Sequence, residues 1–171
     1  MRRTLVSLTL LAALVVSGCG GDSDRSTEEP AAKEAAGGAE ASIEGFGEEA
    51  GGNERSALLA AFEGYLRAIE EEDGPAACSH LSATVRRSLE QIAAESLPGK
   101  GCAAILPRLL APTAPRVARE QRTGEVTKVR IEGDRGFVVF RAPGARLYQL
   151  PMAKEGGRWK AANATAGVLV P

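Results

Sequence analysis

The spacing of apolar side chains changes near Arg122, and no other feature constrains the fold of this chain as strongly. Between residues 54 and 110 apolar side chains recur at every third or fourth position, as on the buried face of a helix. From residue 126 onward they alternate with polar ones, as in strands buried on one face. Helices followed by strands predict an α+β domain in which the helices pack on one face of a sheet.

Four helical segments are expected before this change. The first spans residues 54–72, with Asn53 as its N-cap and a single apolar stripe along its length. A helix-breaking Asp-Gly-Pro sequence separates it from the second. The other three segments are residues 76–81, a stretch capped by Ser82 that ends at Leu97-Pro98-Gly99, and residues 102–110, which stop before Pro112 and Pro115.

Four strands are expected after the change, separated by short turns that contain glycine. Connections this short join antiparallel neighbours, so the strands should form a meander. The predicted fold is therefore α+β, with N-terminal helices packed on a curved, mainly antiparallel four-stranded sheet. The strands are residues 126–132, 137–141, 146–152 and 157–162.

Charge is distributed unevenly along the chain, although the formal net charge is only −1. Residues 20–53 hold nine acidic side chains against two basic ones, and Ile43 and Phe46 are their only large apolar residues. Such a segment buries too little surface to offset its chain entropy. Residues 19–53 are therefore predicted to be a disordered acidic linker with an r.m.s. reach of roughly 30 Å, and residues 54–171 a single domain.

The first residues have the parts of a secretory signal. Two arginines at positions 2 and 3 precede an apolar run over residues 5–16, and the small residues Val-Ser-Gly then lead to Cys19. This arrangement resembles the signal of bacterial lipoproteins, in which the cysteine is acylated and the chain is cut just before it. The resemblance implies a signal peptide over residues 1–18 and a lipid on Cys19. The alternatives are an ordinary cleaved signal with a coincidental cysteine, or an uncleaved anchor.

The lipid implied by this resemblance determines where the protein is expected. Two or more acyl chains give stable anchoring, so the mature chain should stay on the extracytoplasmic face of a cell membrane. Lipoproteins kept at the inner membrane have aspartate after the modified cysteine, whereas this chain has Gly20. In a cell with two membranes, this difference favours the outer membrane.

With Cys19 used by the lipid, two of the three cysteines remain. In an oxidising compartment, Cys78 and Cys102 are expected to form one structural disulfide. Two free thiols or a redox-active pair are the alternatives, but redox pairs usually have Cys-x-x-Cys spacing. A zinc site needs three or four protein ligands, and two cysteines with the single histidine, His80, do not make a convincing set. No metal and no cofactor are predicted.

Two sequence patterns resemble NTF2-like proteins. The first is Phe62-x-x-Tyr65-Leu66-x-Ala68-Ile69, followed by Asp73 and a short helix with a cysteine. The second is the closing sequence Gly157-Arg158-Trp159-Lys160-Ala161-Ala162. The resemblance covers most of residues 54–170. It implies a cone in which a curved sheet wraps around the helices, often with a pocket at the open end.

Some NTF2-like proteins are ketosteroid isomerases or polyketide cyclases, and Tyr65 falls near the tyrosine that binds an oxyanion in the isomerases. Their acidic groups have no counterpart here, because the apolar strands at residues 137–140 and 147–152 contain no Asp or Glu. Proton abstraction needs a base in a dry pocket. His80 has no evident orienting partner, and the acidic run at residues 70–73 lacks the ligand pattern of a calcium loop. No catalytic residue is predicted.

The predicted function is therefore non-enzymatic binding of a small apolar ligand or a protein partner. The candidate cleft residues are Phe62, Tyr65, Val139 and Trp159, with a simple core role as the alternative. An isomerase or cyclase and a structural module at the cell wall are the other hypotheses. Basic side chains between Arg108 and Arg146 could meet anionic lipid or wall polymer, whereas nucleic acid is excluded by the compartment and the scarcity of aromatics. The sequence does not determine the oligomeric state.

Overall fold

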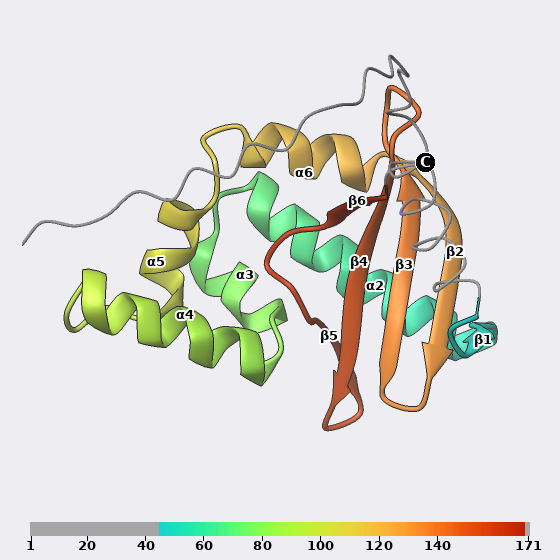
Figure 1. Ribbon diagram of the computed structural model, residues 1–171, viewed down its shortest axis with the longest axis horizontal. Coiled ribbons are helices and arrows are strands. Elements are labelled where there is room, and N and C mark those ends of the chain that lie inside the picture. Colours follow the sequence, from blue (N-terminus) through green and yellow to red (C-terminus); the bar gives the residue numbers. More distant parts are fainter. Residues whose placement is uncertain (1–44, 170–171) are drawn as a thin grey trace, which may run out of the picture.

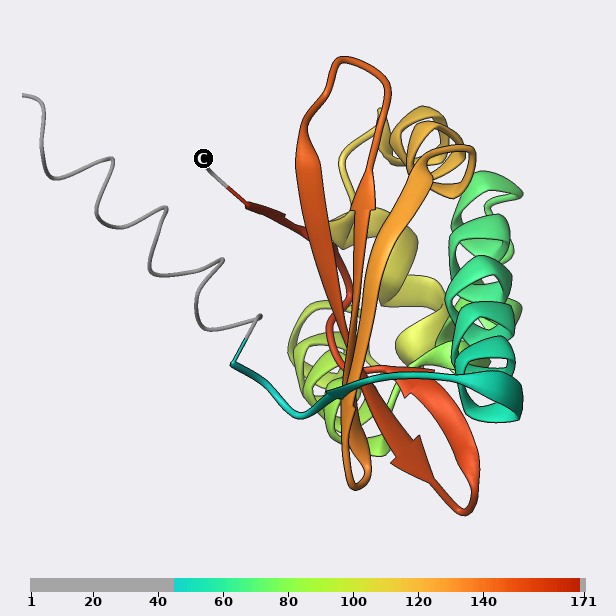
Figure 2. The ribbon, with the colours of Figure 1, turned by 90° about the vertical axis from the view of Figure 1, so that its right-hand side faces the viewer.

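The computed structural model describes residues 45–169. The predicted signal peptide, Cys19 and the linker up to residue 44 lie outside the described residues. The domain has two layers, with a twisted sheet on one side and helices on the other, as seen edge-on in Figure 2. The α+β class predicted from the change of period is confirmed.

The sheet has six strands, all paired antiparallel. Its order is β1-β2-β3-β4-β5, and the short β6 pairs with the other half of β4 (Figure 1). All four predicted strands are present, with bounds that differ by up to three residues, and β1 and β6 are additional. The strands are β1 Glu48–Glu49, β2 Glu125–Glu132, β3 Arg135–Arg141, β4 Leu147–Glu155, β5 Arg158–Ala161 and β6 Gly167–Leu169.

Five helices are described, one more than predicted. The additional helix is α6, which begins between Pro112 and Pro115, where the sequence predicts only the end of a helix. Pro115 instead lies in the first turn of α6, where proline is tolerated because its missing N–H has no partner in the helix. The helices are α2 Gly52–Glu70, α3 Gly74–His80, α4 Ala83–Ser96, α5 Cys102–Leu109 and α6 Ala114–Arg122.

The start of the domain lies upstream of the predicted boundary at Glu54. Helix α2 is capped by Gly51, so the prediction of Asn53 as N-cap is wrong. The preceding strand β1 pairs with β2. Arg130 of β2 also binds the segment just before β1, because its guanidinium donates hydrogen bonds to the backbone carbonyls of Phe46 at 2.8 Å and Gly47 at 2.7 Å. Residues 46–53, which were assigned to a disordered linker, thus form part of the folded domain.

Helix α2 supplies the centre of the core. Leu58, Phe62, Tyr65, Leu66 and Ile69 are buried at helical spacing and form part of the core between the helices and the sheet. Because successive strand residues point to opposite faces, alternate residues of β2, β3 and β4 meet this stripe. They include Val129, Val138, Phe140, Leu150 and Met152.

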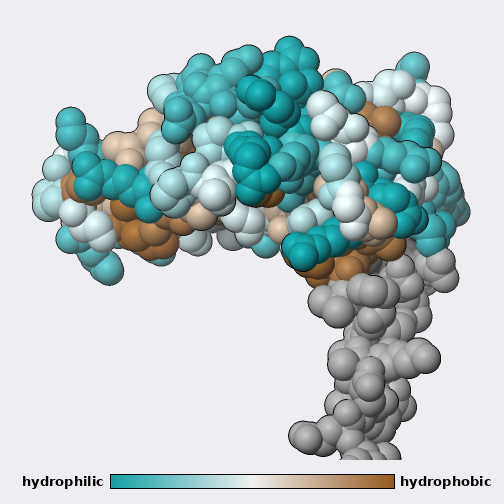
Figure 3. All heavy atoms as spheres, turned by 90° about the horizontal axis from the view of Figure 1, so that it is seen from above, coloured by the Kyte–Doolittle hydropathy of each residue, from teal (hydrophilic) through white to brown (hydrophobic). Residues whose placement is uncertain are grey.

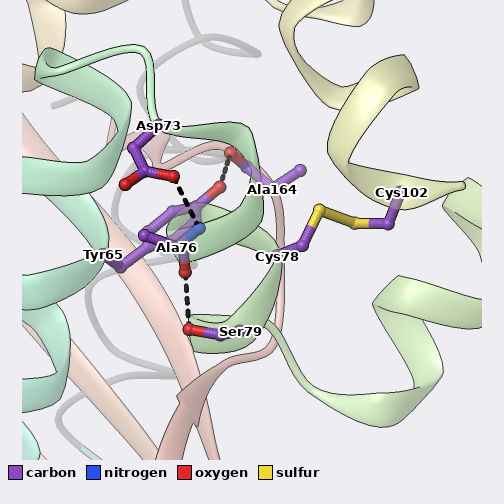
Figure 4. The surroundings of a disulfide bond; sticks show 7 residues. All are labelled: Tyr65, Asp73, Ala76, Cys78, Ser79, Cys102 and Ala164. Atoms are coloured by element: carbon purple, nitrogen blue, oxygen red, sulfur yellow. Dashed lines mark hydrogen bonds between the residues drawn. A yellow bond between two sulfur atoms is a disulfide. The ribbon is translucent and has the colours of Figure 1, made fainter.

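The short helices are fixed by caps and by one covalent bond. Asp73 accepts a hydrogen bond from the Ala76 amide at the start of α3, and Ser82 caps α4 as predicted. The predicted disulfide between Cys78 and Cys102 is present and joins α3 to the first residue of α5 (Figure 4). Among residues 45–169, no helix combines the length and the apolar character needed to cross a bilayer.

Candidate functional site

The four predicted cleft residues do not form one site. Phe62, Tyr65 and Trp159 belong to the core between helices and sheet, whereas Val139 lies on the other face of β3. There Val139 packs with Leu169 and Leu147. The assignment of Val139 to the cleft is therefore wrong, because its neighbours Val138 and Phe140 are the residues of β3 that face the helices.

Two of the remaining three residues are packing residues. The Phe62 ring is 1% exposed and lies 5.0 Å from the Phe140 ring centroid. Trp159 is 4% exposed, and its indole Nε1 donates a hydrogen bond of 2.8 Å to Glu54 Oε1. A second hydrogen bond to this carboxyl, from Lys154, holds the pKa of Glu54 below its usual value. Phe62 and Trp159 therefore fill the core and leave no space for a ligand.

Tyr65 is the predicted residue that does border a cavity. This cavity has a volume of about 170 Å³ and lies between α2, α6, the side of β4 at Tyr148 and the segment between β5 and β6. Apolar groups make up most of its wall, and its lining residues include no Asp, Glu, His, Lys or Arg. They are Tyr65, Leu66, Ile69, Leu110, Ala114, Val117, Ala118, Gln121, Tyr148, Ala164, Thr165 and Ala166.

The Tyr65 hydroxyl holds one wall of this cavity in place. It donates a hydrogen bond of 2.6 Å to the backbone carbonyl of Ala164, across 99 positions of sequence (Figure 4). Burial raises the pKa of the Tyr65 phenol well above its usual value, so the group is neutral at physiological pH. Because its one proton is already used, Tyr65 is a structural donor here and is not free to bind an oxyanion.

Gln121 is the buried polar residue among the cavity residues that were not predicted from the sequence. It is only 7% exposed, and it lies on the face of α6 that carries Ala114, Val117 and Ala118. The signal would have been the spacing of 114, 117, 118 and 121, which places all four on one helix face. Because no helix was predicted over residues 114–122, this spacing could not be assigned to a helix face. A single glutamine gave no other reason to predict a site.

An ion-pair network attaches α6 to α2 beside the cavity. Arg119 Nε donates to Glu70 Oε1 at 2.7 Å, while Arg122 donates to Glu70 Oε2 through Nε at 2.9 Å and Nη2 at 2.7 Å. These hydrogen bonds hold the pKa of the Glu70 carboxyl below its usual value. The carboxylate is therefore charged at neutral pH, and it holds the helix that forms one wall of the cavity.

Groups that could do acid–base chemistry lie elsewhere. Glu72 and Asp73 border a smaller hollow of about 60 Å³ between α2, α3 and α5, where the Asp73 side chain caps α3. His80 ends α3, half-buried, and burial followed by the charge of Lys160 lowers its pKa. Within residues 45–169, no three His, Cys, Asp or Glu side chains come together as a metal site would require.

The basic side chains between Arg108 and Arg146 are spread over α5, α6, the strands β2 and β3 and the turn before β4, rather than gathered on one element. Several are already paired: Arg116 with Glu120, and Arg119 and Arg122 with Glu70. Arg135 instead lies over the ring of Phe46, at 5.4 Å from the centroid. Viewed from above, hydrophilic side chains cover much of the surface (Figure 3).

No protein-family model matches the chain, and no curated protein or solved structure is significantly similar to it. Its function is therefore inferred from its own geometry.

Proposed function

We propose that this chain is a membrane-anchored envelope lipoprotein whose domain binds a small apolar ligand without catalysis. The observation that carries the proposal is the cavity beside Tyr65. Its wall is apolar and lacks every ionisable side chain except tyrosine, and the Tyr65 hydroxyl is already bonded to Ala164. Ligand sites are typically apolar hollows with a few placed polar groups, and this cavity has that composition.

The position of the cavity also supports assignment to the NTF2-like class. The cavity lies between the first long helix and the sheet, at the end where α6 and the segment before β6 meet. NTF2-like proteins often have their pocket between the helices and the open end of the cone. The order of helices before an antiparallel meander agrees with this class, while β6 and α6 would be features of this chain.

The isomerase or cyclase alternative needs a carboxylate that reaches the ligand. The cavity wall has none: Glu70 beside it is bonded to Arg119 and Arg122, and Glu72 and Asp73 border the separate hollow beyond Ile69 and Leu110. A base outside the cavity cannot take a proton from a ligand inside it, because transfer needs contact within about 3 Å or through one water. Binding is therefore the function that this geometry supports best.

Binding is tested by thermal unfolding of the full chain with single-ring, two-ring and steroid probes. A ligand that binds only the folded state at ten times its Kd should add about 1.4 kcal/mol of stability. Ala118→Met should abolish the effect by filling the cavity, whereas Ala94→Met on the exposed face of α4 should leave it unchanged. Absence of any shift in the wild-type chain, or an undiminished shift in Ala118→Met, contradicts the proposal.

The anchor is tested separately by expressing the full chain in a bacterium and measuring its mass and detergent partitioning. Acylation at Cys19 predicts a chain that lacks residues 1–18, carries the added lipid mass and enters the detergent phase. Cys19→Ala should lose the lipid and remain in the aqueous phase, while Cys78→Ala should keep the lipid. A mature chain without lipid on Cys19 would remove the anchor from the proposal and leave the cavity untouched.

A further inference from the structure

We propose that the ligand is an uncharged molecule of about one ring that carries a single hydrogen-bonding group, and that the Gln121 amide binds this group. The inference rests on the proposed function and specifies the class of ligand for the same cavity. Three observations support it: the state of the Gln121 side chain, the absence of charge in the wall, and the volume of the cavity.

The Gln121 amide is buried and available. Within residues 45–169, no residue donates a hydrogen bond to its side chain or accepts one from it, although Gln121 is only 7% exposed. In the same part of the chain, no side-chain polar atom is fully cut off from solvent without a partner. Gln121 lines the cavity, so a ligand there lies beside this side chain.

The Gln121 amide has no protein partner but is not cut off from solvent, so a ligand with a polar group can take the place of water as its partner. A glutamine offers one carbonyl oxygen and two N–H donors, so it can pair with a hydroxyl, a carbonyl or an amide. The other polar groups of the wall are the hydroxyls of Tyr65, Tyr148 and Thr165. The Tyr65 hydroxyl already donates its proton to the Ala164 carbonyl, and Tyr148 and Thr165 are less buried than Gln121. Gln121 is therefore the buried polar group that remains for a ligand.

The wall excludes a charged ligand. A buried ion needs a counterion and further hydrogen bonds, and without them its desolvation is too costly. No basic or acidic side chain lines the cavity. Arg122 follows Gln121 in the sequence, but its guanidinium is bonded to Glu70 at 2.7 Å. A carboxylate or an ammonium in the cavity would therefore be unpaired.

The volume sets the size of the ligand. The cavity measures about 170 Å³, and an engineered apolar cavity of about 150 Å³ in another protein holds one benzene molecule. Drug-sized ligands occupy pockets of about 300–1,000 Å³. A single ring or a chain of a few carbons therefore fills this hollow, whereas a steroid nucleus or a long acyl chain is too large for it to enclose.

The test compares four probes on the full chain by thermal shift and by NMR. Toluene, benzyl alcohol and benzoate are single rings that differ in their polar group, and cholesterol tests the size limit. The variant is Gln121→Leu, which removes the amide and leaves an apolar side chain of similar size on α6. The control is Gln91→Leu on the exposed face of α4.

Benzyl alcohol should bind the wild-type chain more tightly than toluene. Gln121→Leu should weaken benzyl alcohol about two- to tenfold, the range expected for one net hydrogen bond, and leave toluene unchanged. Benzyl alcohol should also shift the side-chain amide resonances of Gln121. Gln91→Leu should change none of these results, and benzoate and cholesterol should not bind in the cavity.

The outcomes separate the two proposals. If toluene and benzyl alcohol bind equally well to the wild type and to Gln121→Leu, Gln121 does not select the ligand, and binding in the cavity stands. If benzoate binds as tightly as benzyl alcohol, the ligand need not be neutral. A cholesterol-induced shift that Ala118→Met abolishes would overturn the size limit. If no probe binds, the proposed function fails together with this inference.

Discussion

Removing the Cys78–Cys102 disulfide should destabilise the domain by an amount that follows from its loop length. The two cysteines are 24 positions apart. In the chain-entropy account, closing a loop of about 25 residues removes enough freedom from the unfolded chain to stabilise the fold by about 3.5 kcal/mol. The bond joins α3 to α5 and closes a loop that contains all of α4, so its loss acts on three helices together.

The assay is urea unfolding of the full chain, followed by tryptophan fluorescence. Trp159 is the only tryptophan and is buried in the core, so its emission reports on loss of the sheet–helix packing. With a slope of about 1.5 kcal/mol per molar urea, a loss of 3.5 kcal/mol lowers the unfolding midpoint by about 2 M.

The perturbation is made in two ways, by reduction of the wild-type chain and by the double variant Cys78→Ala/Cys102→Ala. Both should give similar midpoints, and Cys19→Ala is the control because it removes a cysteine outside the bond. A loss below about 1 kcal/mol in the double variant would refute the reasoning. The unfolded chain would then already be restricted, or the helices would be held together by packing alone.

Three further perturbations test individual contacts. Gly74→Ala should cost about 1–3 kcal/mol in urea unfolding, because its Cβ would lie 2.4 Å from the Ala103 carbonyl oxygen; an unchanged midpoint contradicts this packing. The pKa of His80 is lowered in the folded state, so its contribution to stability is complete above pH 6.5 and is lost as the pH falls through the lowered value. His80→Gln should therefore lose less stability between pH 7.5 and 5.5 than the wild type, and parallel profiles would refute the assignment. Tyr65→Phe should cost about 1 kcal/mol by removing the hydrogen bond to Ala164; faster hydrogen exchange at residues 163–166 is expected, and unchanged exchange would contradict the role of Tyr65 in holding that wall.

Much of the fold could be predicted from local patterns. The stripe on α2, the Asp-Gly-Pro break after it, the cap at Ser82 and the alternation in the four main strands are all local signals, and the structure contains each element they indicate. The cysteine pair could be predicted because two cysteines remained for an oxidising compartment, and both lie in short helical segments that meet.

The elements that were missed depend on distant partners. β1 consists of two glutamates, Glu48 and Glu49, and it exists as a strand because it pairs with Arg130 and Ile131 some 80 residues later. α6 has a polar sequence with a narrow face of small residues, so its apolar period is weak. Neither feature has a strong signal within a short window of sequence.

The candidate site was predicted only at Tyr65. In β3, residues Phe137–Phe140 are all apolar, so alternation could not say which of them face the helices, and Val139 was placed on the wrong side. Phe62 and Trp159 were recognised as apolar anchors, but whether such a side chain borders a hollow depends on packing by other elements. Gln121 could be assigned to the site only from the position of α6, a helix that was not predicted from the sequence.

An NMR titration of the full chain with benzyl alcohol tests most directly whether the cavity beside Tyr65 and Gln121 binds a ligand. We predict saturable shifts in the backbone amides of Leu66, Ala118 and Ala166, which line the cavity, and no shifts at Val139 on the opposite face of the sheet. No saturable shifts at the cavity residues, or shifts confined to the outer face of the sheet, would contradict the account.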